Sequence, residues 1–209
     1  LHPPGATEAP PAHWPGRRGS VLDGAVIFEP TSIDGAVLVR IEPFDDDRGF
    51  FARTWCHEEF AARGIDMEIV QASISHTRLA GTVRGMHYSA LPAREGKLVR
   101  CERGRIHDVI VDIRPESPSF LRQFALELDD RSHLALFIPP FVAHGYQSLE
   151  ADCRVLYMMS DSYRPELARG LRYDDPLLDI RWPLPVSAIA ERDRSWPDLV
   201  RAGSQEPGA

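Results

Sequence analysis

Cysteine is scarce in this chain, which has only Cys56, Cys101 and Cys153 among its 209 residues. An odd number of widely spaced cysteines, without a C-x-x-C motif, argues against a disulfide framework. No apolar run approaches the ~18 residues of a membrane span. The first residues lack the basic start and the apolar stretch of a signal peptide. We therefore expect reduced cysteines, a cytoplasmic location and no membrane partner.

Positively charged residues are fewer than negatively charged ones. The chain has 24 Lys and Arg against 31 Asp and Glu, so its formal net charge is −7. Such a field repels nucleic acid and anionic lipid, and neither is an expected partner. An anionic ligand such as a nucleotide diphosphate would need a local basic pocket, for which Arg48, Arg84, Lys97 and Arg100 are the candidates.

Helical periodicity is nearly absent, and we find no internal repeat. Two short patches, 58–63 and 187–192, are the predicted helices. Short runs rich in Val, Ile, Phe and Tyr, separated by Gly, Pro and Asp, predict strands elsewhere. The predicted strands are 25–29, 36–42, 49–56, 68–76, 82–89, 97–102, 105–114, 120–129, 133–138, 143–149 and 154–160. The runs 97–102 and 105–114, joined through Arg103-Gly104, predict a β-hairpin.

The length and a hydrophobic content of 43% fit one domain with a substantial core. Residues 1–20 are rich in proline and poor in apolar side chains, which predicts a disordered leader. After this leader we expect a single domain over 21–200 and a flexible tail over 201–209. Many short strands with few helices predict an all-β sandwich or jelly-roll barrel. The Pro-, Asp- and Trp-rich chain after Arg164 is expected to pack across the barrel mouth.

Groups suited to proton transfer lie on neighbouring predicted strands. His87 follows Arg84 by three positions, and Lys97 lies ten positions after His87. Tyr157 lies inside an apolar run. A base, a fixed cation and a phenol suit proton transfer next to a carbonyl that is becoming an enolate. A regular strand would point Arg84 and His87 to opposite faces. Either a bulge at Gly85 realigns them, or one of them faces a partner subunit.

The order and spacing of nine motifs between about Phe44 and Leu199 resemble the dTDP-4-dehydrorhamnose 3,5-epimerase family. The motifs are Asp47-Arg48-Gly49-Phe50-Phe51, Val70-Gln71-Ala72-Ser73, Arg84-Gly85-Met86-His87-Tyr88, Lys97-Leu98-Val99-Arg100, Asp108-Val109-Ile110-Val111-Asp112-Ile113-Arg114, Ser117-Pro118-Ser119-Phe120, Ala143-His144-Gly145, Asp174-Asp175-Pro176 and Ile180-Arg181-Trp182-Pro183. The resemblance implies a cupin-type jelly roll and a homodimer. It also implies an isomerase that inverts C3, C5 or both of a nucleotide-linked 4-keto-6-deoxyhexose, without metal or cofactor.

The resemblance also implies roles for single residues. His87 would be the proton acceptor, Tyr157 the proton donor and Lys97 the cation at the enolate oxygen. The imidazole needs a partner on its other nitrogen; the matching aspartate is Asp193, with Asp175 as the alternative. The expected substrate-binding residues are Arg48, Gln71, Ser73, Arg84, His144 and Tyr163, the last of which matches a position that stacks on the nucleotide base.

The chain departs from the family pattern at several positions. Arg53 and Ala168 stand where the family usually has glutamates of the nucleotide-binding set. Ser73 replaces an asparagine, Ser89 a glutamine and Phe141 a glycine. Because the catalytic histidine, lysine and tyrosine persist, we expect the family's reaction with a changed binding of the nucleotide group.

Three other functions remain open on the sequence alone. A metal-dependent cupin binds iron through two histidines and a carboxylate. Such a site usually has closely spaced ligands such as H-x-H, whereas Tyr88 and Ser89 follow His87. A sugar-binding jelly roll without catalytic activity would have no need of Lys97 and Tyr157. A sugar-nucleotide 3,4-ketoisomerase would share the fold and the substrate class but shift the carbonyl.

Overall fold

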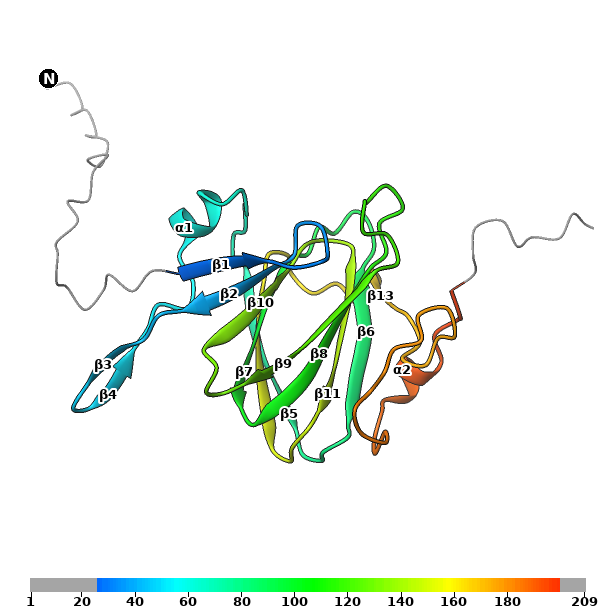
Figure 1. Ribbon diagram of the computed structural model, residues 1–209. Helices are drawn as coiled ribbons and strands as arrows, with labels where there is room; N and C mark the ends of the chain where they lie inside the picture. The colour runs from blue at the N-terminus through cyan, green and yellow to red at the C-terminus, as the bar shows by residue number, and fades with distance from the viewer. Residues whose placement is uncertain (1–25, 200–209) are drawn as a thin grey trace, which may run out of the picture.

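The computed structural model describes residues 26–199, most of whose regular structure is β-strand (Figure 1). A six-stranded sheet has the order β1 (Val26–Pro30), β2 (Val37–Ile41), β10 (Leu134–Ile138), β7 (Lys97–Arg103), β12 (Cys153–Met159) and β5 (Gln71–Thr77). A five-stranded sheet has the order β13 (Ala168–Gly170), β6 (Val83–Ser89), β11 (Val142–Ser148), β8 (Arg105–Asp112) and β9 (Gln123–Asp129). A separate hairpin pairs β3 (Phe44–Asp46) with β4 (Gly49–Phe51), and the short helices are α1 (His57–Ala61) and α2 (Glu191–Arg194).

The two large sheets enclose a common core. Its strand residues are Val99, Cys101, Ile106, Ile110, Leu128, Leu136, Ile138, Val142, Tyr146, Cys153 and Val155. Side chains two positions apart on a strand share a face. Lys97, Asp108, His144 and Tyr157 therefore point into the same interior as this core. The predicted all-β jelly-roll architecture is confirmed, and it places polar groups at one end of an apolar interior.

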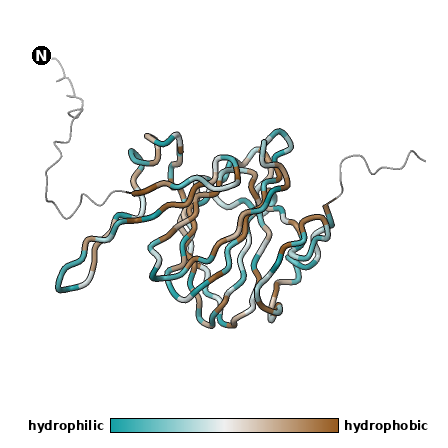
Figure 2. Tube along the Cα trace, viewed as in Figure 1, coloured by the Kyte–Doolittle hydropathy of each residue, from teal (hydrophilic) through white to brown (hydrophobic). Residues whose placement is uncertain are grey.

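Separate apolar clusters cover the outer faces of both sheets. On the six-stranded sheet, Leu98 and Phe137 pack with Phe60 of α1. On the five-stranded sheet, residues such as Val109 pack with Leu178 of the C-terminal segment. Residues of the C-terminal segment such as Leu178 thus cover an outer face. β13 instead extends the edge of the five-stranded sheet, and residues around α2 reach the interior. Figure 2 shows the strands of the sheets carrying hydrophobic stretches, while the tip of the β3–β4 hairpin is hydrophilic.

The predicted hairpin between 97–102 and 105–114 is wrong. β7 pairs with β10 and β12 in one sheet, and β8 pairs with β9 and β11 in the other. The chain changes sheets at Gly104, whose φ is +77°. A Cβ on Gly104 would lie 2.8 Å from the Cys153 sulfur, so this crossing requires glycine.

The helix predicted over 187–192 starts later than expected. The Val83 N–H donates to the Ala188 carbonyl, and Thr82 forms a parallel bridge with Ala188. This backbone is therefore extended, and α2 begins only at Glu191. The predicted leader and tail lie outside the described residues. No helix in the part of the chain that the structure describes is long and apolar enough to cross a membrane.

Candidate active site

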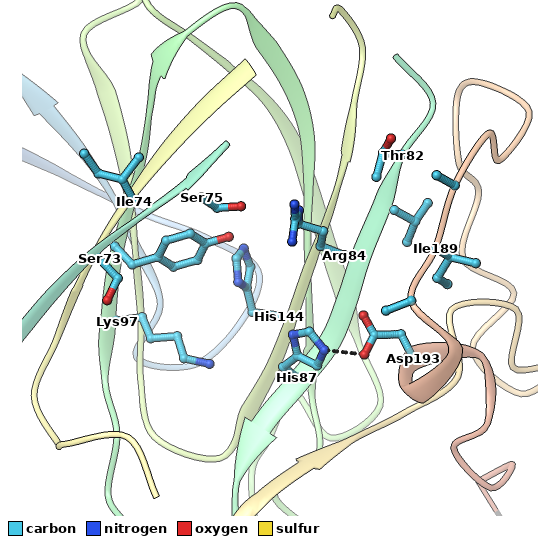
Figure 3. Close-up of a pocket in the computed structure, with 14 residues that line it drawn as sticks. Ser73, Ile74, Ser75, Thr82, Arg84, His87, Lys97, His144, Ile189 and Asp193 are labelled. Carbon is cyan, nitrogen blue, oxygen red and sulfur yellow. Dashed lines mark hydrogen bonds and ion pairs between the residues drawn. The ribbon is translucent and has the colours of Figure 1, made fainter. Parts of the chain in front are cut away.

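A cavity of about 470 Å³ opens between the ends of the two sheets (Figure 3). The predicted site residues that line it are His87, Lys97, Tyr157, Asp193, Ser73, Arg84 and His144. An adjoining depression of about 230 Å³ shares His87, Lys97 and Tyr157. Its further lining includes Tyr163 and Ala168. The two spaces thus meet at the three residues expected to move protons or stabilise charge.

His87 and Asp193 form a hydrogen-bonded pair. The His87 Nε2 atom lies 2.7 Å from Asp193 Oδ1, and the Gly85 N–H donates to Asp193 Oδ2 over 3.3 Å. Burial raises the pKa of Asp193, but the hydrogen bond and charge of His87 outweigh it and hold that pKa below its ordinary value. A carboxylate only accepts, so Nε2 carries the hydrogen and Nδ1 is left to accept a proton. The alternative partner, Asp175, instead accepts from the backbone N–H groups of Leu177 and Leu199.

A bulge in β6 brings Arg84 and His87 to the same cavity. His87 pairs with His144 and Arg84 with Tyr146, so the three-residue step on β6 faces a two-residue step on β11. Gly85 adopts a φ of +132°, and a Cβ there would lie 2.4 Å from the Gly145 Cα atom. Of the two sequence-based explanations, the bulge is the one that the structure shows.

Lys97 is paired with a carboxylate that the sequence analysis missed. The Lys97 Nζ atom lies 3.1 Å from Glu95 Oε1, and both side chains are largely buried. The Ser89 hydroxyl donates to Glu95 Oε2 over 3.0 Å. Glu95 lies on the loop before β7, outside any alternating strand pattern, so no sequence signal marked it.

A second histidine–aspartate pair lies deeper in the interior. The His144 Nε2 atom is 3.0 Å from both carboxylate oxygens of Asp108, and both residues are buried. No role was predicted for Asp108 from the sequence, although its inward position between the apolar Ile106 and Ile110 was a usable signal. The Tyr157 ring packs edge-on against the His144 ring, and the two ring centroids are 5.9 Å apart.

The phenol of Tyr157 is held in its protonated form. Burial raises its pKa well above the ordinary value, and the neighbouring Tyr146 and Asp108 add to the effect. A phenol that resists ionisation keeps a proton available for a strong base such as an enolate.

The remaining predicted binding residues fall into two groups. The Tyr163 N–H donates to Gln71 Oε1 over 3.0 Å, and Gln71 Nε2 donates to Ser73 Oγ over 3.4 Å, so these three form one cluster. Arg48 lies at the tip of the β3–β4 hairpin, is 85% exposed and pairs with Asp46. We expected Arg48 to bind substrate, but the structure does not place it in the cavity of its own chain.

Two other arginines also lie away from the cavity. Arg100 pairs with Glu102, because it points away from the inward face of β7 that carries Val99 and Cys101. Arg53 pairs with Glu59 of α1. Across residues 26–199, no group of three or more His, Cys, Asp or Glu side chains is arranged to hold a metal ion.

The fold and the site define a jelly-roll protein with groups for proton transfer in its interior. The model of the dTDP-4-dehydrorhamnose 3,5-epimerase family matches residues 30–201. An enzyme of that name from Sinorhizobium fredii is 37% identical over 182 residues, which are 87% of this chain and 93% of the relative. A dTDP-4-dehydrorhamnose 3-epimerase from Streptomyces niveus is 33% identical over 183 residues, covering 87% and 86% of the two chains.

Solved structures agree with these relatives. The crystal structure of dTDP-4-dehydrorhamnose 3,5-epimerase from Bacillus anthracis with TDP and PPi bound superposes with a TM-score of 0.81 at 32% identity. The match covers 84% of this chain and 100% of that one. The chain belongs to the dTDP-4-dehydrorhamnose 3,5-epimerase family, and the resemblance drawn from its motifs is confirmed.

Proposed function

We propose that this protein is an isomerase that inverts C3, C5 or both of a nucleotide-linked 4-keto-6-deoxyhexose. The observation that carries the proposal is the convergence of the His87–Asp193 pair, Lys97 and Tyr157 on one cavity. The names of the relatives support the substrate class, because they describe epimerases of dTDP-linked deoxysugars.

The two sheets supply the two sides of the reaction. His87 comes from β6 of the five-stranded sheet, whereas Lys97 and Tyr157 come from β7 and β12 of the six-stranded sheet. A sugar between the sheets would lose the acidic proton next to its carbonyl to His87 on one face. Tyr157 would return a proton to the opposite face, which inverts the centre. Lys97 would stabilise the negative charge on the carbonyl oxygen in between.

The adjoining depression suits the nucleotide diphosphate. Arg169 and Arg192 line it beside the exposed ring of Tyr163. The depression therefore offers local positive charge on a protein whose formal net charge is −7. The planar guanidinium group of arginine can donate paired hydrogen bonds to phosphate oxygens, and an aromatic ring can stack on a nucleotide base.

We further propose that the enzyme is a homodimer. The β3–β4 hairpin projects from the body (Figure 1), and its residues Phe44, Phe50 and Phe51 are 45%, 56% and 51% exposed. Strand β5 is an open edge of the six-stranded sheet and exposes Ile74. Exposed aromatic clusters and open strand edges are features that a partner subunit covers. The paired substitution Phe50→Asp and Phe51→Asp should yield monomers in sedimentation analysis; an unchanged dimer would contradict this interface.

We also place the enzyme in the cytoplasm. Cys56, Cys101 and Cys153 are all free thiols. Burial raises the pKa of Cys101 to about 12, so its thiol stays protonated and unreactive at neutral pH. Three free thiols fit a reducing compartment.

Incubation of a dTDP-linked 4-keto-6-deoxyhexose in deuterated water tests the proposed reaction. The expected result is deuterium at C3, C5 or both, with formation of the inverted sugar, read by NMR. The variant His87→Asn should lose ~10²–10⁴-fold in exchange rate while retaining its fold. A product whose carbonyl has moved to C3 would identify a ketoisomerase, and an unlabelled, unchanged sugar would refute the proposal.

A further inference from the structure

Glu95 is a buried carboxylate next to the cavity that is neither the proposed base nor the proposed acid. Glu95 and Lys97 have side chains that are only 8% and 11% exposed, and their charged ends are 3.1 Å apart. The second carboxylate oxygen of Glu95 accepts from the Ser89 hydroxyl over 3.0 Å. Both oxygens of Glu95 are therefore engaged, one by the lysine ammonium and one by a hydroxyl at the end of β6.

The loop that carries Glu95 is tied, on both sides of this residue, to Ser160 and Asp161, which directly follow β12. The Gly96 N–H donates to the Ser160 hydroxyl over 2.8 Å, and the Arg94 N–H donates to Asp161 over 3.2 Å. The Ser160 N–H also donates to the Gly96 carbonyl over 3.0 Å. These contacts fix the backbone of Glu95 to the end of the strand that carries Tyr157, so the carboxylate has a defined place relative to the proposed proton donor.

Lys97 needs such a partner more than the other groups of the site do. Its ammonium lies at the end of a flexible four-carbon stem. The neighbouring aspartates are already engaged, Asp193 by His87 and Asp108 by His144. Apart from the aspartates, the charged or titratable groups that line the cavity with Lys97 are the two histidines, Tyr157 and Arg84. The adjoining depression adds Tyr88, Glu95, Tyr163, Arg169 and Arg192. Among these residues, Glu95 is the carboxylate that pairs with Lys97.

We propose that Glu95 is a positioning residue that holds the Lys97 ammonium at the carbonyl oxygen of the substrate. This inference rests on the proposed epimerase function. An ammonium has three donors; Glu95 engages one and leaves the others for the cavity, where Figure 3 shows the end of Lys97 on the side of His87 and His144. A fixed cation stabilises a developing oxyanion without reorganising during the reaction.

The substitution Glu95→Gln keeps the size and one acceptor oxygen of the side chain but removes its charge. Lys97 then loses the group that fixes its direction, and we expect kcat to fall ~10–100-fold, as for displacement of a reacting group by about 1 Å. KM should change by less than about threefold, because the nucleotide group is bound in the adjoining depression and an interaction made only in the transition state acts on kcat.

A double-mutant cycle tests whether Glu95 acts through Lys97. Wild type, Glu95→Gln, Lys97→Met and the double variant are compared by deuterium wash-in at C3 and C5 of a dTDP-linked 4-keto-6-deoxyhexose. Lys97→Met should lose ~10²–10³-fold, and adding Glu95→Gln should cost less than about twofold more, because residues that act as a unit are not additive. A fully additive loss, or wild-type activity of Glu95→Gln, would overturn the inference.

Two controls separate this inference from the proposed function and from misfolding. No wash-in by the wild-type protein would refute the proposed function itself, whereas an active wild type with an additive cycle would refute the role of Glu95 alone. TDP binding by calorimetry reports whether each variant keeps its site. Should Glu95→Gln fail to bind TDP, Ser89→Ala replaces it in the cycle. A loss that disappears in the Lys97→Met background supports the inference, and a loss that persists there contradicts it.

Discussion

The substitution Asp193→Asn removes the negative charge beside His87, the proposed base, and keeps the size and shape of the Asp193 side chain. Asp193 Oδ1 lies 2.7 Å from His87 Nε2, and the aspartate side chain is 6% exposed. When His87 takes a proton, the pair becomes an ion pair. Unit charges about 4 Å apart attract by ~4 kcal/mol at an effective dielectric constant of about 20. The His87 side chain is 44% exposed, so solvent screening reduces this figure. A remaining ~3 kcal/mol corresponds to about 10²-fold in kcat.

The assay for Asp193→Asn is deuterium wash-in at C3 and C5, followed by NMR under saturating substrate. We expect a loss of about 10²-fold in kcat with little change in KM, because the charge acts on a group that becomes cationic only during the reaction. Asp175→Asn is the matched control: this second buried aspartate bonds the Leu177 and Leu199 backbone, so its variant should keep activity. If Asp193→Asn retained activity within about threefold of wild type, Asp193 would not support the base.

Three further predictions concern other parts of the protein. Tyr157→Phe should leave deuterium wash-in by the base but strongly reduce formation of the inverted sugar; normal inversion would show that another group delivers the proton. Calorimetry with dTDP, UDP, GDP and CDP should show weakened preference for dTDP, because Ala168 lines the adjoining depression at a position where the family pattern has a carboxylate; clear dTDP preference, unchanged in Ala168→Glu, would contradict this. Although burial opposes it, hydrogen bonding to Arg114 holds the pKa of Asp112 well below its ordinary value, so this residue stabilises the native state above pH ~4 and loses that effect as pH falls. Asp112→Asn should lower the free energy of unfolding at pH 7 by ~3 kcal/mol and flatten its dependence on pH below about 4; an unchanged melting curve across pH would refute this.

Motif order predicted more of the site than strand periodicity did. Alternation on β7 and β12 placed Lys97 and Tyr157 on inward faces, because neighbouring inward positions are apolar. The same rule failed for Arg84 and His87, which it pointed apart. Their common orientation depends on the bulge at Gly85, and periodicity carries no signal for the close approach of two backbones.

Strand periodicity could not predict the partners of the charged groups, and the family resemblance named one of them, Asp193. Asp193 reaches His87 from 106 positions away and Asp108 reaches His144 from 36, so only the packing of the C-terminal segment and of adjacent strands brings them together. Glu95 is close to Lys97 in sequence, but side chains on a loop do not alternate between two faces as they do on a strand. The direction of the Glu95 side chain depends on the hydrogen bonds that hold its loop to the residues after β12.

The amino-acid sequence by itself determined most of the strands, the inward direction of Lys97 and Tyr157, and the family, because these depend on local periodicity and on motifs in a fixed order. Only the tertiary structure decided that β7 and β8 lie in different sheets, that Arg84 and His87 share one cavity and that Arg48 lies outside it. The physical reason is that strand pairing and the direction of loop side chains depend on contacts between residues far apart in the chain. Those contacts exist only after the two sheets have packed around their common core.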